Sequence, residues 1–435
     1  MPSPDIPLPQ GEGGRRPGEG GTGALSAAPQ AAPALPENPT LADYLAYAEA
    51  HNPAVQAAHY DWEAARERVP QARALPDPML SYGFQTMNRI AVRGHEVGLE
   101  QTYPWFGKRD LRAAVAEDEA ATAAERYQAA RLRLAYEVKG AYYAYYYLWR
   151  QVGIVRENRD LVKYLEEVAR TRYKAAAAGH PDVIRAQVEL GRLENELRTL
   201  EDLRGPAAAR LNAALARPTG DPRPWPATLR EEAVDADDER VLGWLREANP
   251  DLRALDRQAA REGAAIELAR KDFYPDVTLG LSYGRASAGF SGGPADMRDD
   301  MLRGMVSVNI PLWRQKYEAA VREAEARRQA ALKMRADREN MLAAETRRVL
   351  YEFRDASRRI GLYRDTLLPK AREALQATEA AYRTGAAPFA DLVDAERMLL
   401  EFQLSYERAL ADAAARLAEA EMLVGREVPR AAQGK

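Results

Sequence analysis

The sequence predicts a mostly α-helical protein with a small membrane β-barrel, built from a duplicated unit in which a strand hairpin precedes a very long helix. Two observations carry this prediction. An ordered series of short motifs occurs twice in the 435 residues, and each copy contains two alternating segments of strand length beside a long segment that is almost free of proline. A repeat of this length indicates two copies of one structural unit.

The duplication spans residues 52–186 and 249–395, and begins with Asn52-Pro53 and Asn249-Pro250, 197 residues apart. Matched motifs then follow in the same order: Pro76-Asp77 with Pro275-Asp276, Ser81-Tyr82-Gly83 with Ser282-Tyr283-Gly284, Pro104 before Trp105 with Pro311 before Trp313, and Tyr173, Asp182 and Ala186 with Tyr382, Asp391 and Ala395. We therefore expect a first structural repeat over 41–225, a second over 226–425 and a tail over 426–435.

Composition excludes several classes of protein. The net charge of −3, from 62 basic and 65 acidic side chains, argues against a nucleic-acid partner. The chain has no Cys, which excludes disulfides and thiolate chemistry. The chain contains no run of 18 apolar residues, so no transmembrane helix is expected. The four histidines lack zinc-ligand spacing, so neither a metal nor another cofactor is expected: His51, His59, His95 and His180.

Residues 1–40 differ from the rest of the chain. They are rich in Gly and Pro and polar, a composition that predicts disorder. The segment has no apolar region typical of a secretory signal. We hypothesise that the true N-terminus is missing or misassigned.

The helices follow from the spacing of prolines and apolar residues. Residues 107–178 contain no proline and predict a rod of roughly 100 Å. The matching segment, 312–384, has only Pro369. Helices of this length pack along one another as coiled coil, and heptad spacing marks two seams: Leu190, Leu193, Leu197 and Leu200, and Leu392, Ala395, Leu399, Phe402, Tyr406, Ala409 and Ala413. The aromatic run 142–149 lies midway along the first rod, where packing between helices is favoured over ligand stacking.

Four segments alternate apolar with small or polar residues, at about 77–87, 95–104, 275–285 and 303–311. Each is close to the length that crosses a bilayer as a tilted strand. The polar segments Asn88 to His95 and Arg285 to Asp300 are interpreted as hairpin tips. Four strands cannot close a barrel and open edges are not tolerated in lipid, so a trimer with 12 strands is expected. A soluble antiparallel sheet is the alternative, weakened because no sequence remains to cover its apolar face.

Two further segments point to a family. QTYPWFGKR at Gln101 to Arg109, and YRTGAAPFADLVDA at Tyr382 to Ala395, together with the duplicated unit, resemble the TolC-like outer-membrane efflux channels over residues 41–425. The resemblance implies a homotrimer, with a 12-stranded barrel in the bacterial outer membrane and a helical barrel of 12 rods in the periplasm. Each chain would supply four rods: the two long helices, 43–72 stacked on 183–214, and 240–271 stacked on 390–424.

The resemblance also implies a function. Such a protein is no enzyme but a passive exit duct of a tripartite efflux or secretion system, in contact with outer-membrane lipid. An inner-membrane pump supplies the energy, and a periplasmic adaptor docks at the two helical tips, 178–182 and 385–389. At these tips Gly179 and Gly385 would end a helix in left-handed geometry, while Pro181 and Pro388 would begin the next. The substrate, whether a drug, a metal ion or a polypeptide, is left open. The alternative is a soluble coiled-coil scaffold or interaction protein with no transport role.

An aperture is expected near the second tip. Asp391 and Asp394 lie three residues apart on one helix face, and would form a ring of six carboxylates in a trimer. The family has selectivity aspartates at the matching positions, although both residues also suit a helix N-terminus. By the same resemblance, Asp182 and Tyr382 would help hold the closed state.

The sequence departs from the family pattern at both tips. A basic residue of the family corresponds to Ala387 here, so that closing link is absent. Arg185, one turn beyond Asp182, is a candidate substitute for it. Ala176 stands where the family usually has Gly, which is the departure at the first tip.

Overall fold

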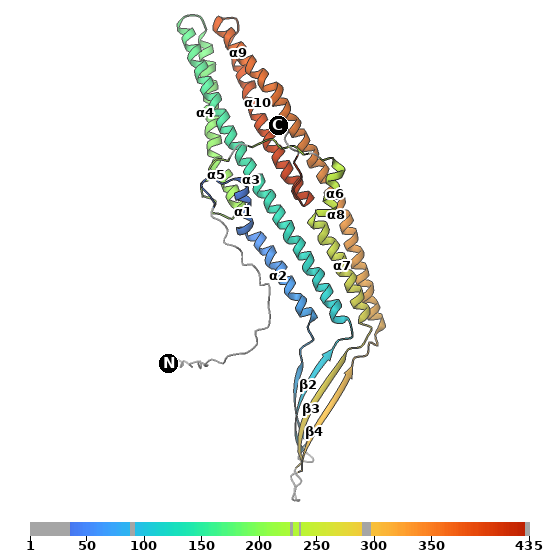
Figure 1. Ribbon diagram of the computed structural model, residues 1–435. Coiled ribbons are helices and arrows are strands. Elements are labelled where there is room, and N and C mark those ends of the chain that lie inside the picture. The colour runs from blue at the N-terminus through green and yellow to red at the C-terminus, as the bar shows by residue number, and fades with distance from the viewer. Residues whose placement is uncertain (1–34, 88–91, 227–228, 235, 289–296, 431–435) are drawn as a thin grey trace, which may run out of the picture.

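The computed structural model describes residues 35–87, 92–226, 229–234, 236–288 and 297–430, so most of the predicted disordered segment lies outside them. Helices occupy one end of an elongated molecule, and a four-stranded sheet occupies the other (Figure 1). None of the described helices combines the length and apolar character needed to cross a membrane. The elements are α1 (Leu41–His51), α2 (Pro53–Arg73), β1 (Met79–Met87), β2 (Val92–Tyr103), α3 (Lys108–Lys174), α4 (His180–Asp202), α5 (Arg204–Ala214), α6 (Asp238–Ala248), α7 (Pro250–Lys271), β3 (Val277–Ala288), β4 (Met297–Val308), α8 (Arg314–Leu362), η1 (Tyr363–Leu367), α9 (Leu368–Thr384) and α10 (Phe389–Val424).

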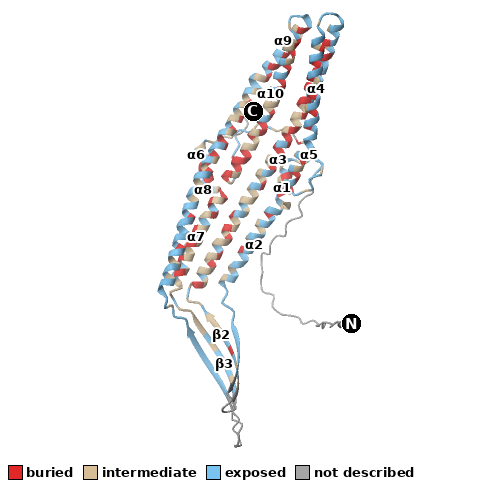
Figure 2. Ribbon diagram, turned by 180° about the vertical axis from the view of Figure 1, so that it is seen from behind, coloured by how far each residue is buried: buried red, intermediate tan, exposed pale blue. Residues whose placement is uncertain are grey.

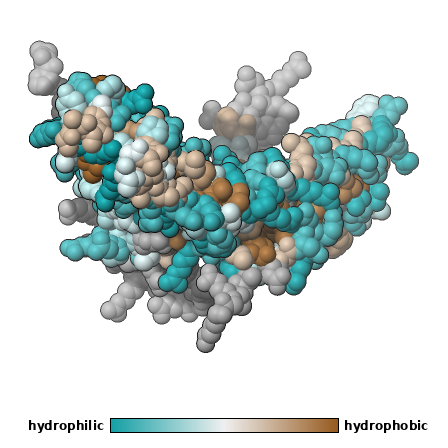
Figure 3. All heavy atoms as spheres, turned by 90° about the horizontal axis from the view of Figure 1, so that it is seen from above, coloured by the Kyte–Doolittle hydropathy of each residue, from teal (hydrophilic) through white to brown (hydrophobic). Residues whose placement is uncertain are grey.

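The helices form a layer of side-by-side rods. Near the sheet the order is α2, α3, α7, α8, and near the tips it is α4, α3, α10, α9 (Figure 1). The 67 residues of α3 run through both levels. Helix α8 continues into α9 through the π-helical turn η1, immediately before Pro369 in the first turn of α9, because a proline cannot supply the regular helical hydrogen bond. Seen from above, the chain is a bent slab with a largely hydrophilic surface (Figure 3).

The repeated Asn-Pro motif joins helices end to end. Asn52 caps α2, and its Nδ2 donates to the carbonyl of Ala214 at the end of α5, at 3.3 Å. Asn249 caps α7 by accepting from the Leu252 N–H at 3.0 Å, and its Nδ2 donates to the Leu423 carbonyl near the end of α10, at 2.7 Å. Each asparagine therefore begins one helix and holds it against the end of another, which gives the stacked arrangement of the shorter helices.

The core lies between the facing sides of the helices, while the sheet is largely exposed (Figure 2). In the predicted seam of α4, Leu193 and Leu197 are buried against α3. The aromatic run also packs between elements. Tyr145 stacks on Trp225 with ring centroids 4.9 Å apart, and the Tyr146 hydroxyl donates to Glu407 at 2.7 Å. Tyr145 therefore packs on the segment between α5 and α6, and Tyr146 contacts α10.

The sheet has the order β1-β2-β3-β4, with every neighbouring pair antiparallel. The β2–β3 pairing, from Val92 with Ala288 to Tyr103 with Val277, joins the two repeats. One expectation needs correction: β3 runs to Ala288 and β4 begins at Met297, so both ends of the predicted tip from Arg285 to Asp300 are strand. Backbone pairing there continues without apolar alternation, and an Arg285–Asp300 ion pair at 2.8 Å spans the two strands. In the first predicted tip, residues 92–95 belong to β2 and residues 88–91 lie outside the described chain.

The two faces of the sheet differ in polarity, as the alternation predicts. Cross-strand rows of one face carry exposed apolar side chains: Tyr82, Val97, Tyr283 and Leu302, and Leu80, Leu99 and Leu281. The opposite face carries mostly small and polar side chains, including a 3.5 Å ion pair between Arg303 and Glu96, together with three exposed methionines: Met79, Met301 and Met305. Among the described residues β1 and β4 each pair with one strand only, so the sheet has two open edges.

Candidate aperture at the helical tips

The first tip differs from the sequence expectation. Helix α3 ends at Lys174, and the left-handed residue of the turn is Ala176, with φ +56°. Gly179 has extended geometry instead, with φ −81° and ψ 152°, and lies just before α4. Pro181 falls in the first turn of α4, where its missing N–H costs no helical hydrogen bond. The prediction of a left-handed Gly179 was wrong, because α3 ends at Lys174 and the left-handed residue falls three positions earlier, at Ala176.

The second tip has the expected glycine. Gly385 ends α9 with φ +85°, a conformation that favours Gly over residues with a Cβ. Pro388 is the N-cap of α10 rather than its first residue, with φ −75° and ψ 155°. All four predicted tip residues are exposed at the end of the molecule opposite the sheet (Figure 1).

The structure brings Asp182 and Tyr382 together. The Tyr382 hydroxyl donates to Asp182 Oδ2 at 3.5 Å, a long and therefore weak hydrogen bond. The Tyr382 ring is 2% exposed and packs edge-on against Phe389, with centroids 5.3 Å apart. Burial, followed by the nearby Asp182 carboxylate, raises the pKa of Tyr382, so its hydroxyl stays protonated and can donate.

Arg172 is the residue that sequence reasoning missed. Its guanidinium lies 4.6 Å from the centre of the Tyr382 ring, and its Nη2 donates to the Ala177 carbonyl at 3.0 Å. A Cβ on Gly385 would lie 3.3 Å from the same nitrogen. Arg172 therefore reaches from α3 across both tips. Arg185 is exposed and makes no hydrogen bond or ion pair with the described residues.

The only available signal for Arg172 was its position one residue before Tyr173, a repeat-matched residue, on the last turn of the long helix. Nothing in the sequence indicates that a side chain from the first repeat covers a ring of the second. The family resemblance placed a basic residue at the position of Ala387, but this alanine is partly buried and has no charge.

Asp391 and Asp394 lie at the start of α10, close to the second tip. Both are exposed, and neither pairs with a basic side chain among the described residues, whereas Leu392 and Ala395 between and beside them are buried. The two carboxylates therefore share the solvent-facing side of the helix.

Two buried carboxylates lie one to two turns further along α4 and α10. Glu189 is 1% exposed and accepts from Arg397 at 2.5 Å and from Arg192 at 2.8 Å. Burial opposes its ionisation, but these hydrogen bonds outweigh burial and lower the pKa of Glu189. Glu396 is fully buried, and neither carboxylate oxygen has a hydrogen-bond partner in the described chain. Burial, with the Glu189 carboxylate nearby, raises the pKa of Glu396 to about 7.

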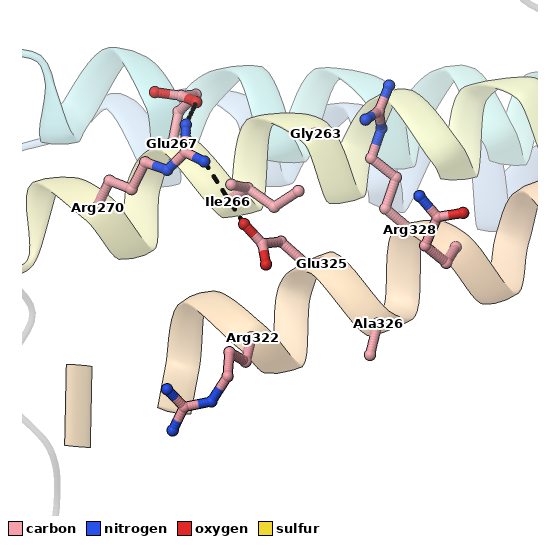
Figure 4. Close-up of a pocket in the computed structure, with 9 residues that line it drawn as sticks. Gly263, Ile266, Glu267, Arg270, Arg322, Glu325, Ala326 and Arg328 are labelled. Carbon is pink, nitrogen blue, oxygen red and sulfur yellow. Dashed lines mark hydrogen bonds and ion pairs between the residues drawn. The ribbon is translucent and has the colours of Figure 1, made fainter. Parts of the chain in front are cut away.

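A surface groove of about 730 Å³ lies between α7 and α8 (Figure 4). Arg270 bridges Glu267 at 2.7 Å and Glu325 at 3.5 Å across it, with Ile266 beneath. The described residues contain no group of three or more His, Cys, Asp or Glu placed to hold a metal ion. Arginine and glutamate side chains line the groove, which is therefore a charged contact between the two helices.

Comparison with known proteins agrees with this geometry. Residues 45–217 and 241–426 match the model of the family described as outer membrane efflux protein. The match covers well over half of the chain, so the chain belongs to this family. Membership identifies an outer-membrane channel protein rather than an enzyme, and does not favour the soluble scaffold.

Individual relatives share the fold. The structure of CusC has a TM-score of 0.76 at 16% identity, over 89% of this chain and 92% of that one. VceC from Vibrio cholerae has a TM-score of 0.73 at 19% identity, over 89% and 97%. In sequence, protein CyaE of Bordetella pertussis is 28% identical over 287 residues, which span 60% of this chain and 59% of CyaE.

Proposed function

We propose that three copies of the chain form an exit duct through the bacterial outer membrane for a tripartite efflux or secretion system. The sheet carries this proposal most directly. Its four strands have an exposed apolar face and two open edges. Three copies joined at these edges would make a closed barrel of 12 strands, which leaves no backbone group unpaired in lipid.

The helical layer supports the same assembly. Near the sheet, α2 and α8 form its two outer edges, and both expose large apolar side chains. On α2, Tyr60 is 65% exposed, while on α8 Met334, Met341 and Tyr351 are 56%, 59% and 65% exposed. Contact between the α8 edge of one copy and the α2 edge of the next would bury them. Such a head-to-tail contact closes into a ring when the rotation allows it.

The tips would form the periplasmic aperture of this duct. Asp391 and Asp394 of three copies would place six carboxylates around the axis and favour cations. Tyr382, held by Asp182 and Arg172, would keep the two helical hairpins of each copy together in the resting state. Gly179, Pro181, Gly385 and Pro388 shape the exposed turns to which a periplasmic adaptor would dock, with an inner-membrane pump behind it.

Native mass spectrometry of the detergent-extracted chain tests the assembly. A trimer has three times the chain mass of 48.3 kDa, or about 145 kDa. The same sample should float with lipid vesicles in a density gradient. A monomer that stays with the soluble fraction would support the scaffold instead and overturn the proposal.

A further inference from the structure

The turn between β2 and α3, residues Trp105 to Lys108, joins the two repeats where the sheet meets the helices, and is called the first corner below. The Trp105 N–H and the Lys108 ammonium each donate to Asp276 Oδ1 at 2.8 Å. Lys108 also donates to the Tyr274 carbonyl at 3.0 Å and is only 2% exposed. The rings of Trp105 and Tyr274 stack with centroids 5.4 Å apart. This corner of the first repeat is therefore seated on the Tyr274–Asp276 segment of the second.

The second repeat has a corner of the same kind. The Lys316 N–H donates to the Trp313 carbonyl at 3.0 Å, as the Lys108 N–H donates to the Trp105 carbonyl at 3.0 Å. Its surroundings differ. Trp313 is 77% exposed, and Lys316 is exposed with no carboxylate partner in the described chain. The second corner therefore has the residues that dock the first, but its lysine Nζ lies 5.6 Å from the centre of the adjacent Tyr317 ring and not on a carboxylate of the other repeat.

In the matching segment of the first repeat, the Gln101 side chain donates to the Pro76 carbonyl at 2.8 Å, but no lysine reaches the aspartate within the described chain. Leu75-Pro76-Asp77 of the first repeat corresponds to Tyr274-Pro275-Asp276 of the second. Asp77 is exposed without a hydrogen-bond partner in the described chain, and Leu75 is 37% exposed. Asp77 precedes β1 and Lys316 follows β4, which are the two outer strands of the sheet. The Trp313–Lys316 corner and the Leu75–Asp77 segment therefore lie at opposite edges of the sheet and cannot meet within one chain.

We propose that the Trp313–Lys316 corner binds the Leu75–Asp77 segment of a second copy of this chain. The Lys316 ammonium pairs with the Asp77 carboxylate of that copy, and the Trp313 ring covers its Leu75. The inference rests on the proposed trimer, and assigns the contact that joins one copy to the next. In a trimer, three such contacts between chains would alternate with the three Lys108–Asp276 contacts within chains. Together they would close a ring at the level where the barrel meets the helices.

The two repeats differ slightly in length near this contact. From Asp276 to the Ser-Tyr-Gly motif is six residues, whereas from Asp77 it is four. Because side chains alternate along a strand, a difference of two residues leaves Asp77 on the same face as Asp276, but shifts its position along the strand by about 7 Å. Because of this shift, the test below scans residues 75–77 and does not rely on Asp77 alone.

Cysteine cross-linking tests this contact without background, because the chain contains no Cys. Lys316→Cys is combined in turn with Leu75→Cys, Pro76→Cys and Asp77→Cys, and the detergent-extracted protein is treated with a short bis-maleimide. We expect covalent dimers and trimers on a denaturing gel. The Lys108→Cys, Asp276→Cys pair is the matched control and should cross-link within one chain. Lys108→Cys with Asp77→Cys should not cross-link.

Charge reversal provides an independent measurement. Asp77→Lys should weaken trimer association at least about tenfold, because it places two cations together at an interface. Asp77→Lys with Lys316→Asp should restore much of it. If native mass shows a trimer but no scanned pair cross-links while the control pair does, this contact is wrong and the duct stands. If the protein is a monomer, both proposals fail.

Discussion

Replacing Arg172 with Ala should loosen the two helical tips. The guanidinium lies 4.6 Å from the centre of a Tyr382 ring that is 2% exposed, so the contact is largely removed from water. A desolvated cation–π contact contributes about 2 kcal/mol. The hydrogen bond to Ala177 stays within the first tip and is not counted, because water replaces it at an exposed carbonyl. About 2 kcal/mol corresponds to a roughly 30-fold shift from joined toward separated tips in each chain.

The assay is the resting conductance of the purified protein in planar bilayers. Arg172→Ala should raise the open probability or the mean conductance, and Arg172→Lys should lie between it and the unmodified protein, because lysine keeps the charge but not the flat stacked group. Arg198→Ala is the matched control, an exposed arginine on α4 without a partner among the described residues. Equal resting conductance for Arg172→Ala and the unmodified protein would refute the assigned role of Arg172.

Three further predictions concern other parts of the molecule. Asn249→Ala removes a helix cap and a buried donor to the Leu423 carbonyl, and should lower the free energy of unfolding by about 2–4 kcal/mol. Asn52→Ala, at a more exposed cap, should lower it by about 1 kcal/mol. Equal losses of the two variants in thermal unfolding would contradict this difference. Asn at both Asp391 and Asp394 should reduce cation preference, measured as the reversal potential in a salt gradient; an unchanged potential would remove the selectivity claim. Burial raises the pKa of Glu396 to about 7 from 4.5, so the folded protein holds this proton more tightly than the unfolded chain. The free energy of unfolding should therefore fall by about 3 kcal/mol as pH rises from about 4.5 to about 7. Glu396→Gln should abolish this pH dependence, while Glu401→Gln, at an exposed position on α10, should keep it.

Much of the fold could be predicted because it depends on local patterns. Proline spacing predicted α3, and the alternation of apolar residues predicted which face of the sheet is exposed. The missed strand ends around Arg285 and Asp300 lack that alternation, since an ion pair across two strands leaves no periodic signal in sequence. The single proline of the second rod, Pro369, follows directly after η1, but a proline alone does not predict whether a helix breaks or continues through a π-helical turn.

The tips were harder to predict because their contacts join residues distant in sequence. Asp182 and Tyr382 were expected to act together through the family resemblance, and the structure places them 3.5 Å apart. Arg172 came from neither periodicity nor resemblance, because its partner ring is 210 residues away. The left-handed residue of the first tip was placed at Gly179 on composition, whereas the end of α3 puts it at Ala176.

Single-channel recording in a planar bilayer tests the central claim most directly, with protein refolded from detergent as residues 41–435. The proposed duct predicts a small, steady conductance with cation preference from a trimer that has spanned the membrane. No conductance, together with an elongated particle that remains soluble without lipid or detergent, would contradict the account.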